Sequence, residues 1–209
     1  MGLYSLITAG STSIAVWSLE ELTSGLSSTP DTHFDLPPRY SPRAIERAAV
    51  ISGLSSLNHY ETVAHHPNGR PYLEDTKLNI SVSHAGRFVA VALDKEDYIG
   101  VDIEQTDRKF RRVASRYLSP LELEWICTDS HQSMALAWCI KESIYKLPWV
   151  AGKSFTQDIK ISPFSNALTE GNLVVEVSNG CDIIRLLSNY RFFDGYCLVW
   201  VCAKKVIFQ

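Results

Sequence analysis

The first 38 residues of this 209-residue chain contain no lysine and no arginine, and Arg39 is the first basic residue. A secretory signal peptide opens with a positively charged segment, so we expect no signal peptide here. No apolar run approaches the ~20 residues that a membrane-spanning helix needs, so we expect no membrane partner. Internal repeats and low-complexity tracts are also absent, which argues against a repeat architecture.

The chain also has few cysteines and a small net charge. The chain has five cysteines, an odd number, and none of them forms a C-x-x-C pair. This usage is typical of reduced thiols in a cytoplasmic protein and gives no support for a zinc site. The formal net charge of −3 argues against a general nucleic-acid-binding protein. With 45% hydrophobic residues, the chain can bury an ordinary globular core.

The pattern of apolar residues predicts an α+β fold with mainly antiparallel sheets. We expect strands over 13–19, 78–83, 88–93, 98–104, 159–161, 173–177, 183–189 and 196–203, and helices over 42–57, 120–127 and 132–147. A short helix over 17–26 and a loop over 24–38 are also expected, and 94–97 is expected to join two strands as a hairpin. Each half then contains a helix and a short sheet. We therefore predict two similar lobes, 1–105 and 106–209, with pseudo-twofold symmetry and the functional site at their seam.

The predicted helix over 132–147 has two distinct faces. One face is apolar and is expected to lie against the core; its members are Leu136, Ala137, Ile140, Ile144 and Leu147. The other face is expected to carry Trp138, Lys141, Glu142, Tyr145 and Lys146. A carboxylate between two ammonium groups is suited to a charged ligand, although Glu142 and Lys146 are also an ordinary i,i+4 surface pair.

The predicted strand over 98–104 places two carboxylates on one face. Asp102 and Glu104 are two residues apart, so they share a face and repel each other unless a cation lies between them. Gly100 lies on the same face and leaves room for a ligand. The alternative is a solvated strand end.

Basic residues occur in two places. Arg39, Arg43 and Arg47 lie around the start of the helix over 42–57, where they suit an anion or a plain surface. The segment 107–116 contains five basic residues, which form either a solvated face or a docking site for an acidic partner. His84 at a strand end is either a phosphate ligand or an ordinary polar residue.

Two spaced motifs resemble a known family. Gly100-Val101-Asp102-Ile103-Glu104 is followed, 38 positions after its glutamate, by the glutamate of Trp138-Cys139-Ile140-Lys141-Glu142-Ser143-Ile144-Tyr145-Lys146. Ser83-His84 precedes both motifs. This arrangement resembles the 4′-phosphopantetheinyl transferases of the larger, surfactin-synthetase-activating type, and the resemblance covers about 69–146.

The resemblance implies a reaction and a set of site residues. A serine of an acyl or peptidyl carrier protein attacks the β-phosphate of coenzyme A, receives the phosphopantetheine arm and releases 3′,5′-ADP. Asp102, Glu104 and Glu142 would hold Mg²⁺, while Lys141 and Lys146 would contact the pyrophosphate. Ser83 and His84 would meet the 3′-phosphate, and Arg47 and Arg70 would add basic contacts to the same co-substrate.

The base that takes the serine proton is left open by the sequence. The candidates are Glu142, Glu122 and a metal-bound water. A metal and two ammonium neighbours would lower the pKa of Glu142 and make it a poor base. Glu122 follows Ser119 in a predicted capping box and matches an acidic position of the family.

Two other functions stay open at this point. The chain could be a non-catalytic protein of the same fold that binds carrier proteins through the basic segment, or another Mg²⁺-dependent nucleotidyl or phosphoryl transferase. The carrier is expected to be acidic, and a monomer would suffice for a two-lobe protein.

Overall fold

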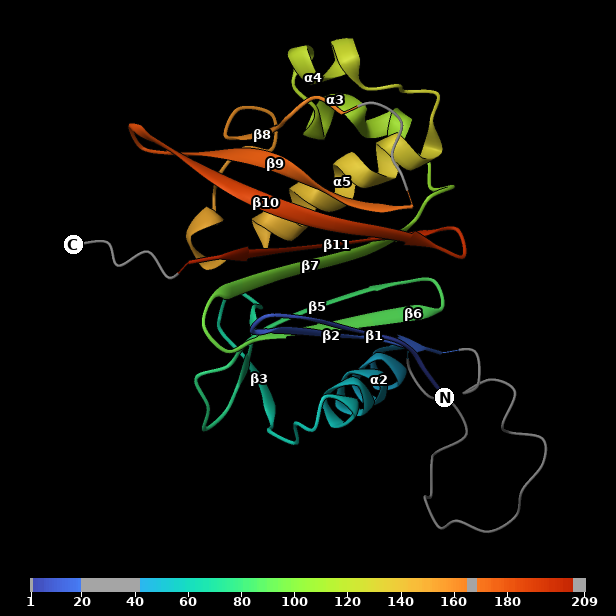
Figure 1. The fold of residues 1–209 in the computed structure, drawn as a ribbon, viewed down its shortest axis with the longest axis vertical. Coiled ribbons are helices and arrows are strands. Elements are labelled where there is room, and N and C mark those ends of the chain that lie inside the picture. The colour runs from blue at the N-terminus through green and yellow to red at the C-terminus, as the bar shows by residue number, and fades with distance from the viewer. Residues whose placement is uncertain (1, 20–41, 165–168, 205–209) are drawn as a thin grey trace.

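The computed structural model describes residues 2–19, 42–164 and 169–204. Within these ranges the chain is α+β, as predicted, and two antiparallel sheets lie between helices (Figure 1). The expected short helix over 17–26, the loop over 24–38 and Arg39 fall largely or wholly outside the described residues. Among the described helices, none combines the length and the hydrophobicity of a membrane-spanning helix.

The first sheet has the strand order β1-β2-β6-β5 and is covered on its outer face by helix α2. The elements are β1 (Gly2–Ala9), β2 (Thr12–Ser18), α2 (Pro42–Ser56), β5 (Asn79–Ala85) and β6 (Phe88–Asp94). Strand β6 is buried along its whole length because both of its faces are covered. Val89, Val91 and Leu93 pack with residues of α2, while Phe88 and Ala90 face the second sheet. Two short strands, β3 (Val63–His65) and β4 (Pro71–Leu73), form a separate ribbon between α2 and β5.

The second sheet has the order β7-β11-β10-β9-β8, with helix α5 on its outer face (Figure 1). The strands are β7 (Tyr98–Gln105), β8 (Ile159–Ile161), β9 (Glu170–Asn179), β10 (Asp182–Phe193) and β11 (Tyr196–Ala203). The helices are η2 (Phe110–Val113), α3 (Ala114–Tyr117), α4 (Pro120–Trp125), α5 (His131–Tyr145) and η3 (Pro148–Val150). The predicted capping box at the start of α4 is confirmed, because Ser119 and Glu122 make both of its hydrogen bonds.

Strand β7 corrects the predicted hairpin over 94–97. It leaves β6 and pairs antiparallel with β11 of the second sheet, so the turn after Asp94 carries the chain from one sheet to the other. Its apolar residues explain the crossing. Ile99, Val101 and Ile103 are buried between the two sheets, together with Leu198 and Trp200 of β11. The predicted lobe 1–105 therefore ends in a strand of the C-terminal sheet, and the division at 105/106 stays a prediction.

The long helix α5 brings its motif to the opposite face of β7. The predicted apolar face is confirmed, since its five residues, Leu136, Ala137, Ile140, Ile144 and Leu147, are almost completely buried. Gly100 of β7 lies so close to the backbone of α5 that an added Cβ would collide with the carbonyl oxygen of Ser143. The glycine was expected to leave room for a ligand. It instead lets the helix backbone approach the strand, and this approach brings Glu142 toward Asp102 and Glu104.

Candidate active site

Three carboxylates from β7 and α5 form an electrostatically coupled group. Burial raises the pKa of Glu104, and the charge of Asp102 raises it further against the opposing charge of Arg108. Burial also raises the pKa of Glu142, with Asp102 and Glu104 adding to the effect and Lys146 opposing it. Mutual repulsion of this kind shows that the three side chains share one environment.

The raised pKa of Glu142 differs from the expectation. A metal and two ammonium neighbours were expected to lower this pKa. Lys146 and, to a smaller extent, Arg108 lower the pKa of Glu142, whereas Lys141 turns away into the interior.

Two cations lie against this group. Lys146 caps the end of α5, and its Nζ donates to Asp102 Oδ1 at 2.8 Å and to the Val101 carbonyl at 2.7 Å. The guanidinium of Arg108 forms an ion pair with Glu104. The same guanidinium lies over the Trp138 ring, 5.6 Å from its centroid. The three carboxylates are thus partly neutralised by the chain's own cations.

The donor set fits a divalent cation. Carboxylate oxygens are the ligands that Mg²⁺ prefers in proteins. Asp102 Oδ2 is buried and has no hydrogen-bond partner, so it has a lone pair that a cation would satisfy. Within the described residues, no three His, Cys, Asp or Glu side chains are gathered closely enough to hold a metal as they stand. A bound ion would therefore require the carboxylates to move away from Lys146 and Arg108.

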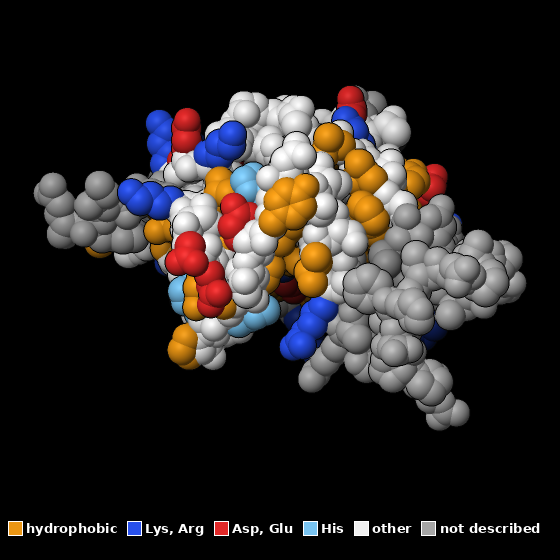
Figure 2. Space-filling view, turned by 90° about the horizontal axis from the view of Figure 1, so that it is seen from below, with side chains coloured by type: hydrophobic (Ala, Val, Ile, Leu, Met, Phe, Trp, Pro, Cys, Tyr) orange, Lys and Arg blue, Asp and Glu red, His pale blue; other side chains and the backbone are white. Residues whose placement is uncertain are grey.

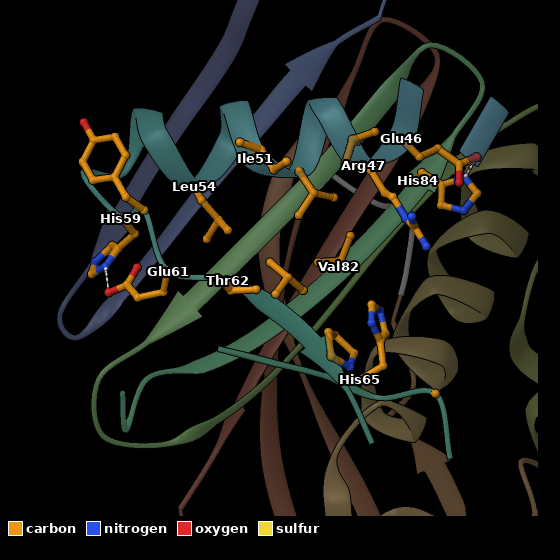
Figure 3. A pocket seen from close by; sticks show the side chains of 16 residues that line it. Glu46, Arg47, Ile51, Leu54, His59, Glu61, Thr62, His65, Val82 and His84 are labelled. Atoms are coloured by element: carbon orange, nitrogen blue, oxygen red, sulfur yellow. Dashed lines mark hydrogen bonds and ion pairs between the residues drawn. The ribbon is translucent and has the colours of Figure 1, made fainter. Parts of the chain in front are cut away.

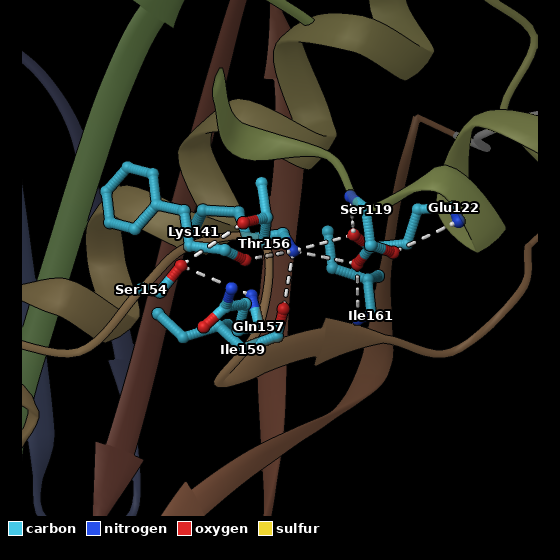
Figure 4. A network of polar contacts seen from close by, with 9 residues as sticks. Ser119, Glu122, Lys141, Ser154, Thr156, Gln157, Ile159 and Ile161 are labelled. Carbon is cyan, nitrogen blue, oxygen red and sulfur yellow. Dashed lines mark hydrogen bonds and ion pairs between the residues drawn. The ribbon is translucent and has the colours of Figure 1, made fainter. Parts of the chain in front are cut away.

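Lys141 and Glu122 form a separate, buried ion pair (Figure 4). The ammonium lies 2.8 Å from both carboxylate oxygens and also donates to the carbonyl groups of Phe155 and Ile159. The Glu122 carboxylate accepts from the backbone N–H of Ile161 as well. Burial lowers the pKa of Lys141, and the charge of Glu122 partly restores it.

This geometry corrects the expected roles of both residues. Lys141 is completely buried and its three hydrogens are engaged by four oxygens of the interior, so none is left for a pyrophosphate. Glu122 is 3% exposed, so a carrier serine cannot reach it in this arrangement. The pair joins α4 and α5 to β8 and is structural.

Ser83 and His84 lie on opposite faces of β5. The Ser83 hydroxyl donates to Asp102 Oδ1 at 2.7 Å across the seam between the sheets. The His84 side chain is about half exposed, with Nδ1 3.4 Å from Glu46 Oε1 of α2. The structure therefore does not bring these two residues to one subsite, because adjacent residues of a strand point in opposite directions.

A cavity of about 820 Å³ lies between α2, the β3–β4 ribbon and β5. Arg47 and His84 point into one end of it, and an ion pair between His59 and Glu61 borders the other end (Figure 3). Its wall between them is apolar and includes Val50, Leu54, Val63, Val82 and Val89. Histidine, acidic and hydrophobic side chains gather on this face of the molecule (Figure 2). The cavity suits an apolar ring system that carries an anionic group.

A second cavity of about 440 Å³ extends toward the end of α5. It shares Gly69, Pro71 and Val82 with the first cavity, so the two are neighbours. Arg70 and Lys146 both line it. Arg70 is partly buried with its guanidinium 5.4 Å from the centre of the Tyr98 ring, and burial lowers its pKa. Together the two cavities extend from Arg47 and His84 near α2 to Lys146 at the end of α5.

Two charged residues of this region were not singled out from the sequence. Arg108 was expected only as part of the basic segment, yet it contacts Glu104. Arg108 follows Glu104 by four residues, but this spacing predicts an ion pair mainly within a helix, and Glu104 lies on a strand. Glu46 pairs with His84 across two elements distant in sequence, and no local pattern could have predicted that pair.

Comparisons with known proteins match the part of the site that is formed by β7 and α5. Residues 98–176, from β7 into β9, match the family model of the 4′-phosphopantetheinyl transferase superfamily. The chain is also similar to a Haemophilus influenzae protein named "Putative 4′-phosphopantetheinyl transferase", with 31% identity over 86 residues. That alignment covers 38% of this chain and 37% of the relative, so only about a third of the relative's length is spanned.

The matched segment contains the three carboxylates, Lys146, and the buried Lys141–Glu122 pair. Arg47, Arg70, Ser83 and His84 lie outside it. Residues 98–176 hold both sequence motifs and the carboxylate group between β7 and α5, and this part of the chain is similar to the 4′-phosphopantetheinyl transferase superfamily.

Proposed function

We propose that this protein transfers the 4′-phosphopantetheine arm of coenzyme A to a serine of an acyl or peptidyl carrier protein, with Mg²⁺ as cofactor and 3′,5′-ADP as the second product. The family supports phosphopantetheinyl transfer in general. The observation that carries the finer proposal is the buried, partnerless Asp102 Oδ2 beside two further carboxylates and Lys146. We also propose the larger, surfactin-synthetase-activating type, on the resemblance of the two motifs.

The residues divide into a metal group and a phosphate group. Asp102, Glu104 and Glu142 would hold Mg²⁺, which when bound would neutralise charge on the pyrophosphate. Lys146 now donates to Asp102, and in the loaded site it would donate to a pyrophosphate oxygen. Phosphoryl transfer depends chiefly on such positioning and charge neutralisation.

The two neighbouring cavities fit the shape of coenzyme A. The larger one offers an apolar wall for adenine, with Arg47 and His84 at one end for a phosphate. The smaller one leads past Arg70 to Lys146, where the pyrophosphate would lie. With Glu122 enclosed by the core, Glu142 is the remaining carboxylate among the proposed bases of this chain.

The test is incubation of the protein with coenzyme A, Mg²⁺ and an apo carrier protein, followed by mass spectrometry of the carrier. We expect the carrier to gain the mass of one phosphopantetheine arm. Asp102→Asn and Glu142→Gln should reduce the rate at least a hundredfold, since each removes a charged ligand of the proposed site.

A matched control separates site effects from general damage. Glu96→Gln removes an exposed carboxylate from the turn after β6 and should leave the rate unchanged. Carrier binding without any mass gain, across fatty-acid, polyketide and nonribosomal-peptide carriers, would instead favour a non-catalytic binding protein. A larger thermal shift with ATP than with coenzyme A would favour a different phosphoryl transferase.

A further inference from the structure

The two oxygens of the Asp102 carboxylate differ in their hydrogen bonding. Its Oδ1 accepts hydrogen bonds from the Ser83 hydroxyl at 2.7 Å and from Lys146 Nζ at 2.8 Å, whereas its Oδ2 is buried and accepts none. An unpaired buried carboxylate oxygen costs free energy, and a bound cation beside two further carboxylates would offset that cost.

The two donors to Oδ1 differ in how firmly they are placed. Lys146 is partly exposed, has four rotatable bonds, and would leave Asp102 to bind a pyrophosphate. Ser83 belongs to β5, which packs against β7, and is 8% exposed. Its short side chain cannot follow a ligand, so its hydrogen bond would persist when the site is loaded.

Strand β5 presents two serines to β7 with different partners. Ser81 accepts a hydrogen bond from the backbone N–H of Val101, at 3.0 Å, and so joins strand to strand. Ser83 instead contacts the functional carboxylate one residue further along β7. Because its hydroxyl is turned toward Asp102, Ser83 lies on the opposite side of β5 from His84 and the larger cavity.

We propose that Ser83 is a positioning residue, whose hydroxyl orients Asp102 so that its free oxygen meets a divalent cation, and is not a contact for the 3′-phosphate of coenzyme A. This inference rests on the proposed function. Hydrogen-bonding partners of metal ligands are typically worth 10- to 100-fold in metal affinity. The role assigned to Ser83 is therefore visible in metal binding itself, before any transfer occurs.

The test measures thermal unfolding of the protein with saturating coenzyme A and without a carrier, over a series of Mg²⁺ concentrations. Ser83→Ala should shift the Mg²⁺ concentration of half-maximal stabilisation upward by about tenfold or more. Ser83→Cys keeps nearly the same volume but offers a weak donor, and it should shift the midpoint in the same direction. Ser81→Ala, the matched control, should stay within about twofold of wild type.

A second measurement compares coenzyme A with dephospho-coenzyme A, both without Mg²⁺. Ser83→Ala should retain the wild-type preference between them, whereas His84→Ala should reduce it. An unchanged Mg²⁺ midpoint in both Ser83 variants, or a preference lost in Ser83→Ala, would overturn the inference. If the variants give these results while the wild-type protein transfers the arm, only the role of Ser83 is refuted. If the wild-type protein neither responds to Mg²⁺ nor transfers the arm, the proposed function is refuted too.

Discussion

Lys141 shows how an ammonium group can be kept in a protein interior. Its charge is balanced by Glu122 and its hydrogens are accepted by two further backbone carbonyls. Removing one member of such a pair leaves the other charge buried without compensation, which costs more than the pair itself contributes.

We therefore predict that Lys141→Met lowers the free energy of unfolding by about 3–5 kcal/mol. Denaturant titration measures this change. The double variant Lys141→Met/Glu122→Leu should recover much of the loss, because it removes both charges. A Lys141→Met protein of wild-type stability but with a raised KM for coenzyme A would restore the phosphate-contact role instead.

Gly100 carries the second prediction at this scale. A Cβ at this position would collide with the Ser143 carbonyl oxygen, which belongs to a helix backbone and cannot rotate away. Gly100→Ala should lower the free energy of unfolding by about 2–3 kcal/mol. Because the strain separates β7 from α5, stabilisation by Mg²⁺ should also weaken.

Gly171→Ala is the matched control for Gly100→Ala. Its added Cβ would meet Tyr190 Oη, the far end of a side chain that can move, so a smaller loss is expected. Equal losses of stability in the two variants would contradict the close approach of β7 and α5.

At the scale of single elements, Asp94 at the end of β6 organises the crossing between sheets. Its Oδ1 accepts from the backbone N–H groups of Glu96 and Asp97, and its Oδ2 accepts from Thr12 at 2.6 Å. Burial alone would raise the pKa of Asp94, but these hydrogen bonds together outweigh it and lower the pKa below its ordinary value.

Asp94→Asn should therefore destabilise the protein by about 2 kcal/mol at neutral pH, the scale of hydrogen bonds to a charged group. A carboxyl whose pKa is lowered by folding stabilises the native state above its unfolded pKa of about 3.9, and this stabilisation disappears as the pH falls through the folded pKa. Denaturant titrations from pH 7 to pH 2 should show a difference from wild type that is constant above the unfolded pKa and shrinks below it. A constant difference across that range would contradict the role of the charge.

The basic segment is distributed over η2 and α3. Arg111 is largely exposed, and its ion pair with the similarly exposed Asp129 contributes little to stability. If an acidic carrier docks here, Arg111→Glu/Arg112→Glu should weaken carrier association at least tenfold at low salt and reduce its dependence on salt. Arg185→Glu, an exposed arginine of β10, is the control expected to bind normally. Unchanged association of the double variant would show that the carrier does not dock on this surface.

Most elements could be predicted because their signals are local. The α5 core face follows helical periodicity, and the start of α4 follows its capping box. Strand β1 was not predicted, and its edge position explains why: only one side pairs, so Leu3, Tyr4 and Leu6 stay substantially exposed and the strand lacks a clear alternation. Lys141 points into the interior because its ammonium group donates to β8, which begins 18 residues later. Helix periodicity alone could not predict this contact and wrongly assigned Lys141 to the exposed face.

At the scale of the whole molecule, the site depends on how the two sheets meet. The sequence motifs predicted that Asp102, Glu104 and Glu142 would converge, and the coupled pKa shifts agree with that proximity. The motifs could not predict that β7 joins β11, because a short polar turn serves a hairpin and a crossing equally well. The contacts of Asp102 with Ser83 and Lys146 follow from this crossing and were invisible in the sequence.

The proposed function requires that one divalent cation binds between β7 and α5. The most direct measurement is anomalous scattering from a crystal grown with coenzyme A and Mn²⁺, which replaces Mg²⁺ at oxygen-ligand sites. We predict a single strong peak bounded by Asp102, Glu104 and Glu142, with the pyrophosphate beside it. A peak remote from these carboxylates, or a bound coenzyme A with no metal between them, would contradict the account.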